Sequence, residues 1–138
     1  MTVVVDTPVW SIALRRRVRD LSRVEEGVAA EWRLLVRENR AVLCGPVRLE
    51  VLSGLADAGA FESLRTRLRW FRDEPLHGED FEEAARGWNA CRSAGIAATH
   101  ADMIVCAVAA RLDGPIFTTD GDFARYARVL PVRLHRPR

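Results

Sequence analysis

TVVVDTPVW, residues 2–10, is the stretch on which the predicted fold depends. Residues 2–5 are a short run of β-branched, mostly apolar side chains, which favours a strand buried on both faces of a sheet. Thr7 and Pro8 follow in the order of a helix N-cap and a proline at the first helical position. The stretch therefore predicts a buried strand that passes directly into a helix, with Asp6 at the junction.

Short apolar runs alternate with helical patterns along the rest of the chain. Further strands are predicted at residues 41–44, 115–118 and 132–135, with a weak one near 75–76. Apolar residues at helical spacing predict helices over residues 23–39, 45–55, 60–71, 79–93 (stopped by Gly95), 101–111 and 121–127. This alternation predicts an α/β sandwich around a mainly parallel sheet, in which ligands bind beyond the carboxyl ends of the strands.

The composition is that of a soluble globular protein, with 49% hydrophobic and 29% charged residues. The 138 residues suffice for one domain with an ordinary core. No apolar run approaches the roughly 20 residues of a membrane span, and the N-terminus lacks the basic start of a signal peptide. Three widely spaced cysteines without a C-x-x-C motif favour buried thiols in a reducing cytoplasm.

The basic residues are unusual in kind, since all 21 are arginine, although the net charge is only +2. Chemistry that requires a lysine is therefore excluded. Arginines cluster within residues 15–19, 65–72 and 133–138. These patches could hold a phosphate backbone, or they could be solvated helix faces.

Four acidic residues occupy unusual positions for side chains that prefer water. Asp6 and Asp120 each follow a predicted strand, so they project from the same end of the sheet if both strands are parallel and central. Glu50 and Asp102 lie among apolar neighbours on predicted helices, where a buried carboxylate is unfavourable unless it is paired or bound to a metal. An α/β fold could gather all four around one cleft.

Each acid also has a purely structural interpretation. Asp6 could hydrogen-bond the start of the following turn, and Glu50 could point to solvent. Asp102 fits a capping box, and Asp120 could cap the last predicted helix with Asp122 favouring its positive end. Taken singly these interpretations are reasonable, but they do not explain why the four acids occur as a set.

The set has the chemistry of a divalent-cation site. Carboxylate oxygens without histidine or cysteine partners suit Mg²⁺ or Mn²⁺ rather than zinc. Neighbouring carboxylates raise one another's pKa unless a cation offsets the repulsion. One ion, or two about 3.5–4 Å apart, could activate water and hold a phosphodiester. Thr118, two residues before Asp120, could orient a carboxylate or a water through its hydroxyl.

Four motifs in order resemble those of PIN-domain ribonucleases of the VapC toxin type. They span nearly the whole chain: VVVDTPVWS (3–11), PVRLEVLSGL (46–55), THADMIVCAVA (99–109) and IFTTDGDF (116–123). The resemblance implies a single PIN domain over residues 1–138, folded as a three-layer α/β/α sandwich with a mainly parallel central sheet. It implies Asp6, Glu50, Asp102 and Asp120 as catalytic acids, the three aspartates as metal ligands, and Thr118 and Asp122 as supporting residues.

The resemblance also implies an activity and partners. These are endoribonuclease cleavage by water that Mg²⁺ or Mn²⁺ activates, an RNA substrate such as tRNA or another structured RNA, a VapB-type antitoxin, a homodimer and a cytoplasmic location, with translation and growth inhibited by the free toxin. Arg92 and Arg48 are candidate contacts to RNA or antitoxin, although Arg92 could equally be a solvated helix end. Trp70 and Phe71 could serve an antitoxin or dimer surface, or pack in the core.

Other functions remain as alternatives. Phosphatases and receiver domains with an aspartyl nucleophile need a supporting lysine, which this chain lacks. No Cys-His or Ser-His-Asp arrangement stands out, so water is the better nucleophile; His100, close to Asp102, could contact substrate or lie on the surface. A PIN-fold ribonuclease that is not a toxin, or a catalytically silent RNA- or protein-binding module, stays open.

Overall fold

A three-stranded parallel sheet runs through the middle of the molecule, with the order β2-β1-β3. The computed structural model describes all 138 residues. The strands are β1 (Val3–Val5), β2 (Ala41–Val42) and β3 (Ile116–Phe117). Val4, in the central strand, pairs with Val42 on one side and with Ile116 on the other. The strands are parallel because helices connect them, as parallel pairing requires.

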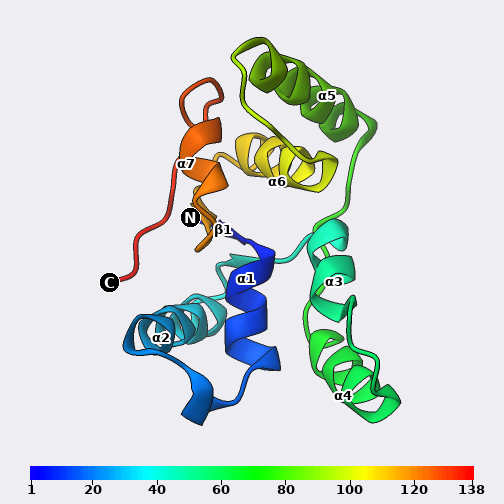
Figure 1. Cartoon of the computed structure of the whole chain (residues 1–138), viewed down its shortest axis with the longest axis vertical. Coiled ribbons are helices and arrows are strands. Elements are labelled where there is room, and N and C mark those ends of the chain that lie inside the picture. The colour runs from blue at the N-terminus through cyan, green and yellow to red at the C-terminus, as the bar shows by residue number, and fades with distance from the viewer.

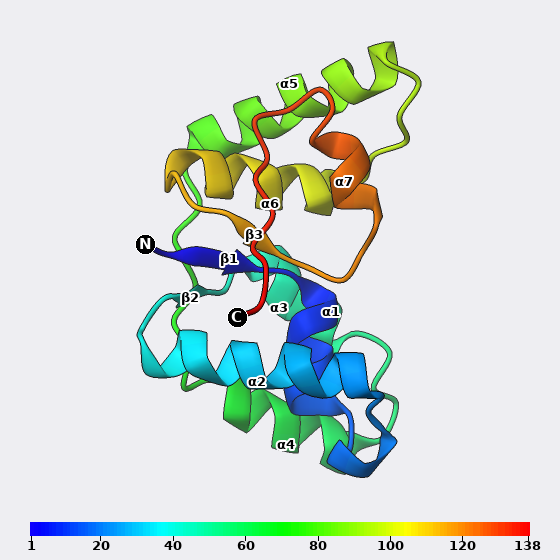
Figure 2. The same ribbon diagram turned by 90° about the vertical axis from the view of Figure 1, so that its left-hand side faces the viewer.

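Helices cover both faces of this sheet (Figures 1 and 2). They are α1 (Thr7–Trp10), α2 (Arg23–Arg37), α3 (Gly45–Leu52), α4 (Ala58–Leu68), α5 (Gly78–Ser93), α6 (His100–Arg111) and α7 (Asp122–Tyr126), with a π-helical turn at Ser11–Arg15 and a 3₁₀ turn at Val18–Asp20. Figure 2 shows α5, α6 and α7 on one side of β1 and α1, α2 and α4 on the other. The predicted three-layer α/β/α sandwich is thus confirmed, and no helix has the length and apolar character needed to cross a membrane.

Two predicted strands are not formed as strands. The segment 132–135 contributes only a bridge from Leu134 to Ile116, because β3 is too short to pair with more of it. Near residues 75–76 the pairing instead occurs earlier, between Asp73 and Leu43. Pro75 has no N–H group to donate to a strand, which explains why the pairing does not continue through it.

Helix ends depart from the predicted ones where the backbone turns left-handed. The helix predicted over 45–55 ends at Leu52, because Ser53 is extended and Gly54 then adopts a φ of +84°. The one predicted over 23–39 ends at Arg37, and Asn39 has a φ of +55°. Gly95 has a φ of +74° just beyond α5, which confirms it as a helix stop.

The core is built around β1 and the aromatic side chains beneath it. Trp10 is fully buried, and its indole N–H donates to the carbonyl oxygen of Val5 at 3.0 Å. Its ring packs edge-on against Trp32 and Phe71, with centroids 5.4 and 4.9 Å away. Phe71 is therefore partly buried and packs against the core, whereas its neighbour Trp70 is 86% exposed.

Gly114 allows β3 to approach the start of β1. A β-carbon at this position would lie 2.4 Å from the carbonyl oxygen of Thr2, which is shorter than any ordinary contact. We expect Gly114→Ala to lower the free energy of unfolding by about 1–3 kcal/mol, measured by urea denaturation. The control is Gly27→Ala on an exposed face of α2, where a β-carbon meets no other atom and should stabilise by roughly 0.5–1 kcal/mol. Equal stability of the two variants would contradict this assignment.

Candidate functional site

Asp6 lies at the carboxyl end of β1, where the parallel register brings it beside β3. Its backbone N–H donates to the carbonyl oxygen of Phe117 at 2.9 Å. Its side chain is only 4% exposed and makes no N-cap hydrogen bond to α1. One carboxylate oxygen instead accepts a hydrogen bond from the Thr118 hydroxyl at 2.8 Å. The carboxylate therefore lies at the carboxyl ends of the strands and does not cap the helix.

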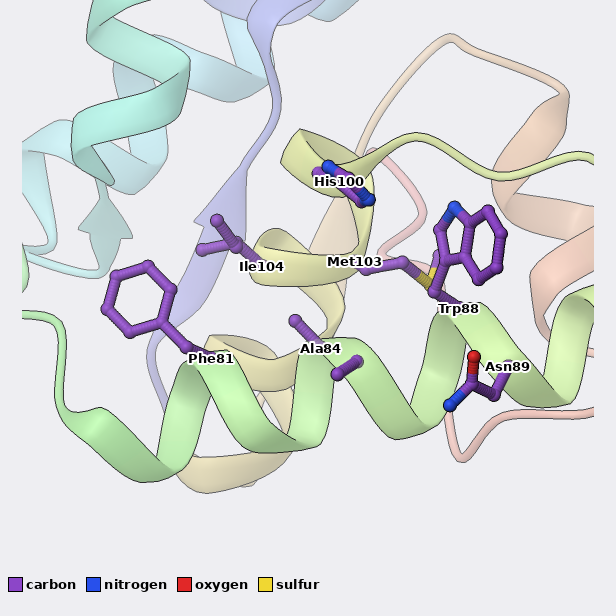
Figure 3. A pocket seen from close by; sticks show the side chains of 8 residues that line it. Phe81, Ala84, Trp88, Asn89, His100, Met103 and Ile104 are labelled. Atoms are coloured by element: carbon purple, nitrogen blue, oxygen red, sulfur yellow. The ribbon is translucent and has the colours of Figure 1, made fainter.

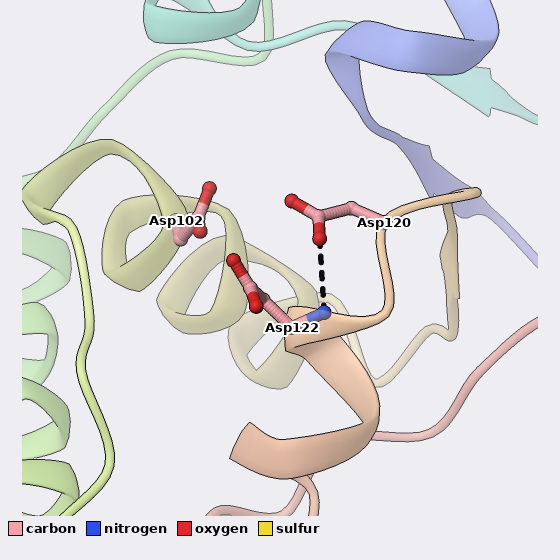
Figure 4. Close-up of side chains that lie close together, drawn as sticks. All are labelled: Asp102, Asp120 and Asp122. Carbon is pink, nitrogen blue, oxygen red and sulfur yellow. Dashed lines mark hydrogen bonds between the residues drawn. The ribbon is translucent and has the colours of Figure 1, made fainter.

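Thr118 joins Asp6 to the segment that follows β3. While its hydroxyl donates to Asp6, its oxygen accepts the backbone N–H of Asp120 at 3.0 Å. A carboxylate oxygen of Asp120 in turn accepts the backbone N–H of Asp122 at 2.9 Å (Figure 4). The chain therefore turns tightly after β3, and this turn holds Asp120 and Asp122 on the same side.

Asp102 reaches the same place from α6. Its backbone N–H donates to the Thr99 hydroxyl at 3.1 Å, as in a capping box. Its side chain does not complete the box, because its Oδ2 accepts the hydroxyl of Tyr126 at 2.6 Å. One oxygen each of Asp102, Asp120 and Asp122 lie within 4.8 Å of one another, and Figure 4 shows the three side chains converging.

Glu50 lies at the margin of this group. It is exposed on α3, but partial burial and the nearby charge of Asp102 raise its pKa. The buried Thr7 hydroxyl lies close enough to Glu50 to oppose this rise in part, although the two groups do not meet the distance and angle of a full hydrogen bond.

The acids repel one another and are partly withdrawn from water. Burial raises the pKa of Asp6 to about 6, and the charges of Asp102 and Glu50 add to the rise, while the hydrogen bonds from Thr118 and the following backbone oppose it. Burial likewise raises the pKa of Asp102; the Tyr126 hydrogen bond opposes this, and Asp120 adds to it. A divalent cation would offset this repulsion.

The donor set fits such a cation. Ligand oxygens of Mg²⁺ or Ca²⁺ lie roughly 2.0–2.6 Å from the ion, so two of them lie at most about 4–5 Å apart. Asp102, Asp120 and Asp122 meet this limit with carboxylate oxygens alone, which favours a hard cation. Of these three aspartates, only Asp122 forms an ion pair, and its partner is Arg125.

The sequence-based assignment of roles differs from this geometry in two places. Asp122, expected as a supporting residue, belongs to the tight trio, while Asp6, expected as a ligand, is linked to the trio through Thr118 and electrostatically. Tyr126 was not anticipated. Its position four residues after Asp122 puts both on one face of a helix, and that spacing was the available signal.

The two arginines proposed as contacts have different surroundings. Arg48 is occupied within the fold, since it donates to Asp73 at 2.9 Å and to the carbonyl oxygen of Phe71 at 2.7 Å. Arg92 is exposed, with its guanidinium carbon 5.2 Å from the centre of the Trp88 ring. Several other arginines also form ion pairs within the molecule. Arg138, for example, pairs with Glu31 and Glu38.

Trp88 also lines an apolar pocket of about 290 Å³ between α5 and α6 (Figure 3). Phe81, His100 and Ile104 contribute to the same pocket. His100 thus lines this pocket, although it is only two residues from Asp102 in sequence. Its ring centroid is 6.1 Å from that of Trp88.

Comparison with known proteins agrees with the order of the motifs and the fold. A family model described as the PIN domain matches residues 3–129. The chain belongs to the PIN domain family. The match contains Asp6, Glu50, Asp102, Asp120 and Asp122.

Three solved structures share the fold of this PIN domain. FitAcB from Neisseria gonorrhoeae is 21% identical, with a TM-score of 0.76 over 99% of this chain and 98% of that one. VapBC2 from Rickettsia felis, bound to a DNA fragment from their promoter, is 12% identical, with a TM-score of 0.74 over 98% of each chain. FitAB bound to an IR36 DNA fragment is 21% identical, with a TM-score of 0.74 over 97% and 94%. No curated protein matches the sequence significantly.

Proposed function

We propose that this protein is a metal-dependent endoribonuclease that acts as the toxin of a toxin–antitoxin pair, and that residues 1–138 form a single PIN domain. The observation that carries the nuclease proposal is the convergence of Asp102, Asp120 and Asp122 beside the buried Asp6. Nuclease chemistry is also what membership of the PIN family supports.

Each side chain of the site has a role that follows from its position. Asp102, Asp120 and Asp122, with Asp6 behind them, would hold Mg²⁺ or Mn²⁺. When bound, such an ion supplies electrostatic stabilisation of the phosphate and makes water more acidic. Thr118, in the segment that follows β3, holds the Asp6 carboxylate in place. We propose that Glu50, which is exposed and has a raised pKa, accepts the proton of the attacking water at a carboxylate oxygen.

The toxin role and the partners rest on likeness. The motifs resemble those of VapC toxins, and a structure of similar fold is VapBC2 bound to DNA from their promoter. We therefore propose a VapB-type antitoxin, a homodimer, a cytoplasmic location and an RNA substrate such as tRNA. The free protein would inhibit translation and growth. Arg92, exposed beside Trp88, is the better placed of the two arginines for a contact with RNA or antitoxin.

Cleavage of RNA by the purified protein tests the enzymatic proposal. We expect cleavage with Mg²⁺ or Mn²⁺ and none after EDTA treatment, because no lysine or activated protein nucleophile is available to replace the ion. Fragments are resolved by gel and their 5′ ends mapped, with single-stranded DNA of the same sequence as the control. Binding of RNA without cleavage at any metal concentration would instead favour a silent binding module.

Induced expression in a bacterial host tests the toxin role separately. We expect growth to stop on induction and to resume when a cognate VapB-type antitoxin is co-expressed. If metal-dependent cleavage is observed in vitro but growth is unaffected, the protein is a PIN-fold ribonuclease that is not a toxin.

A further inference from the structure

Tyr126 is buried against the acidic site and bound directly to one of its carboxylates. Its side chain is 1% exposed, and its ring packs edge-on against Phe123 with centroids 5.1 Å apart. Its hydroxyl donates to Oδ2 of Asp102 at 2.6 Å, the short distance typical of a hydroxyl bound to an ionised carboxylate. It is the only tyrosine in the chain.

The hydrogen bond connects the two helices that contribute the converging acids. Asp122 lies in the first turn of α7, and Tyr126 lies one turn later on the same face. Asp102 lies in the first turn of α6. The hydrogen bond between Tyr126 and Asp102 therefore links α7, which carries Asp122, directly to the α6 carboxylate.

The same contact restrains the rotation of the Asp102 carboxylate. The terminal torsion of an aspartate is broad, so an unrestrained carboxylate samples many orientations. With Oδ2 accepting from Tyr126, lone pairs remain on both oxygens, and one oxygen lies within 4.8 Å of those of Asp120 and Asp122. The hydrogen bond thus orients the carboxylate without using all of its capacity as a ligand.

We propose that Tyr126 is a positioning residue that orients Asp102 for a divalent cation and fixes the spacing between Asp102 and Asp122. The proposal rests on the proposed function, because it assigns Tyr126 a role toward the ion of that site. A purely structural tyrosine would contribute to folding through its ring and leave the affinity for the ion unchanged.

Removal of the hydroxyl alone tests the role. Tyr126→Phe keeps the buried ring, and we expect its Kd for Mn²⁺, measured by titration calorimetry without RNA, to rise about 10–100-fold. Thermal unfolding in EDTA establishes that the variant is folded. The control is Ser53→Ala, which removes a hydroxyl that donates to Leu49 on exposed α3 backbone and should bind Mn²⁺ as the wild type does. A wild-type Kd for folded Tyr126→Phe would overturn the proposal.

The single tyrosine also provides a spectroscopic test that involves no variant at Tyr126. Protein labelled with ¹³C at the phenol carbon gives one tyrosine resonance, since the chain has one tyrosine. We expect Mg²⁺ to shift this resonance with the midpoint of calorimetric binding, because the ion polarises the carboxylate that accepts the hydrogen bond. A resonance that does not move on saturation with Mg²⁺ would overturn the proposal.

Asp102→Asn separates this inference from the function on which it rests. If Asp102→Asn binds Mn²⁺ as the wild type does, the ion does not use this carboxylate, and both the site and the role of Tyr126 are wrong. If Asp102→Asn loses binding while Tyr126→Phe keeps it, the site stands and only the positioning role is rejected. Loss in both variants, with Ser53→Ala unchanged, is the expected result.

Discussion

Asp102→Asn is expected to lower the rate of Mg²⁺-dependent RNA cleavage by about 100- to 1,000-fold or more, since several kcal/mol of metal-based stabilisation correspond to this range. The substitution removes one negative charge from the converging trio. Its amide oxygen can still accept the Tyr126 hydroxyl, so the local packing should persist. The measurement is kcat/KM for a defined RNA over a range of Mg²⁺ concentrations, with thermal unfolding to establish the fold.

The matched control for this variant is Asp113→Asn. Asp113 is highly exposed, pairs with Arg133 and has a φ of +51°, a conformation that asparagine adopts readily. Asp113→Asn makes the same chemical change away from the acidic site and should leave cleavage at the wild-type rate. Equal cleavage by wild type, Asp113→Asn and Asp102→Asn would refute the assignment of Asp102.

Asp6→Asn is expected to make the metal-free protein more stable at pH 8 by about 2–3 kcal/mol, although it should also lose cleavage. Burial raises the pKa of Asp6 from 3.8 to about 6, so the folded state holds a proton more tightly than the unfolded state does. The folded wild type therefore loses stability as the pH rises from about 4 through 6, and each unit of pKa corresponds to about 1.4 kcal/mol. Asparagine keeps the acceptor for Thr118 without the buried charge.

Denaturation by urea in EDTA at pH 4.5 and pH 8 measures this effect as the difference between variant and wild type. The difference is the relevant quantity because other acids act in the opposite direction. Burial disfavours ionisation of Glu31 and Asp80. The hydrogen bonds and charges of their partners, His135 and Arg138 for Glu31 and Arg111 and His77 for Asp80, together outweigh it and hold both pKa values below their usual range. These groups stabilise the fold at neutral pH and lose that contribution in acid in both proteins. If the stability difference between variant and wild type is the same at both pH values, the pKa of Asp6 is not raised in the folded state.

The acidic side chains proposed to bind the ion also lower the stability of the metal-free fold. The buried carboxylate of Asp6 and the converging acids of the neighbouring trio disfavour the metal-free fold, and a bound cation would remove part of this penalty. We therefore expect the cost to stability and the capacity to bind an ion to reside in the same side chains. Functional sites commonly depart from the pattern of the surrounding core in this way.

The outline of the fold follows from local patterns. Three consecutive valines before Asp6, and an apolar pair ahead of Thr118, are strands because β-branched and aromatic residues suit a sheet that is buried on both faces. Less was predictable at the ends of elements. The segment 132–135 reads as a strand, but its pairing depends on how much of β3 is available, and only Leu134 finds a partner.

Which acids stand apart, and that Asp6 and Asp120 lie at the same end of the sheet, could be predicted from the sequence, because parallel strands end on the same side of a sheet. That Asp122 lies with Asp102 and Asp120, and that Tyr126 donates to Asp102, became visible in the folded structure alone. Those contacts depend on how α7 packs against α6. Hydrophobic periodicity states which face of a helix is buried, but not which polar atoms of two neighbouring helices come within hydrogen-bonding distance.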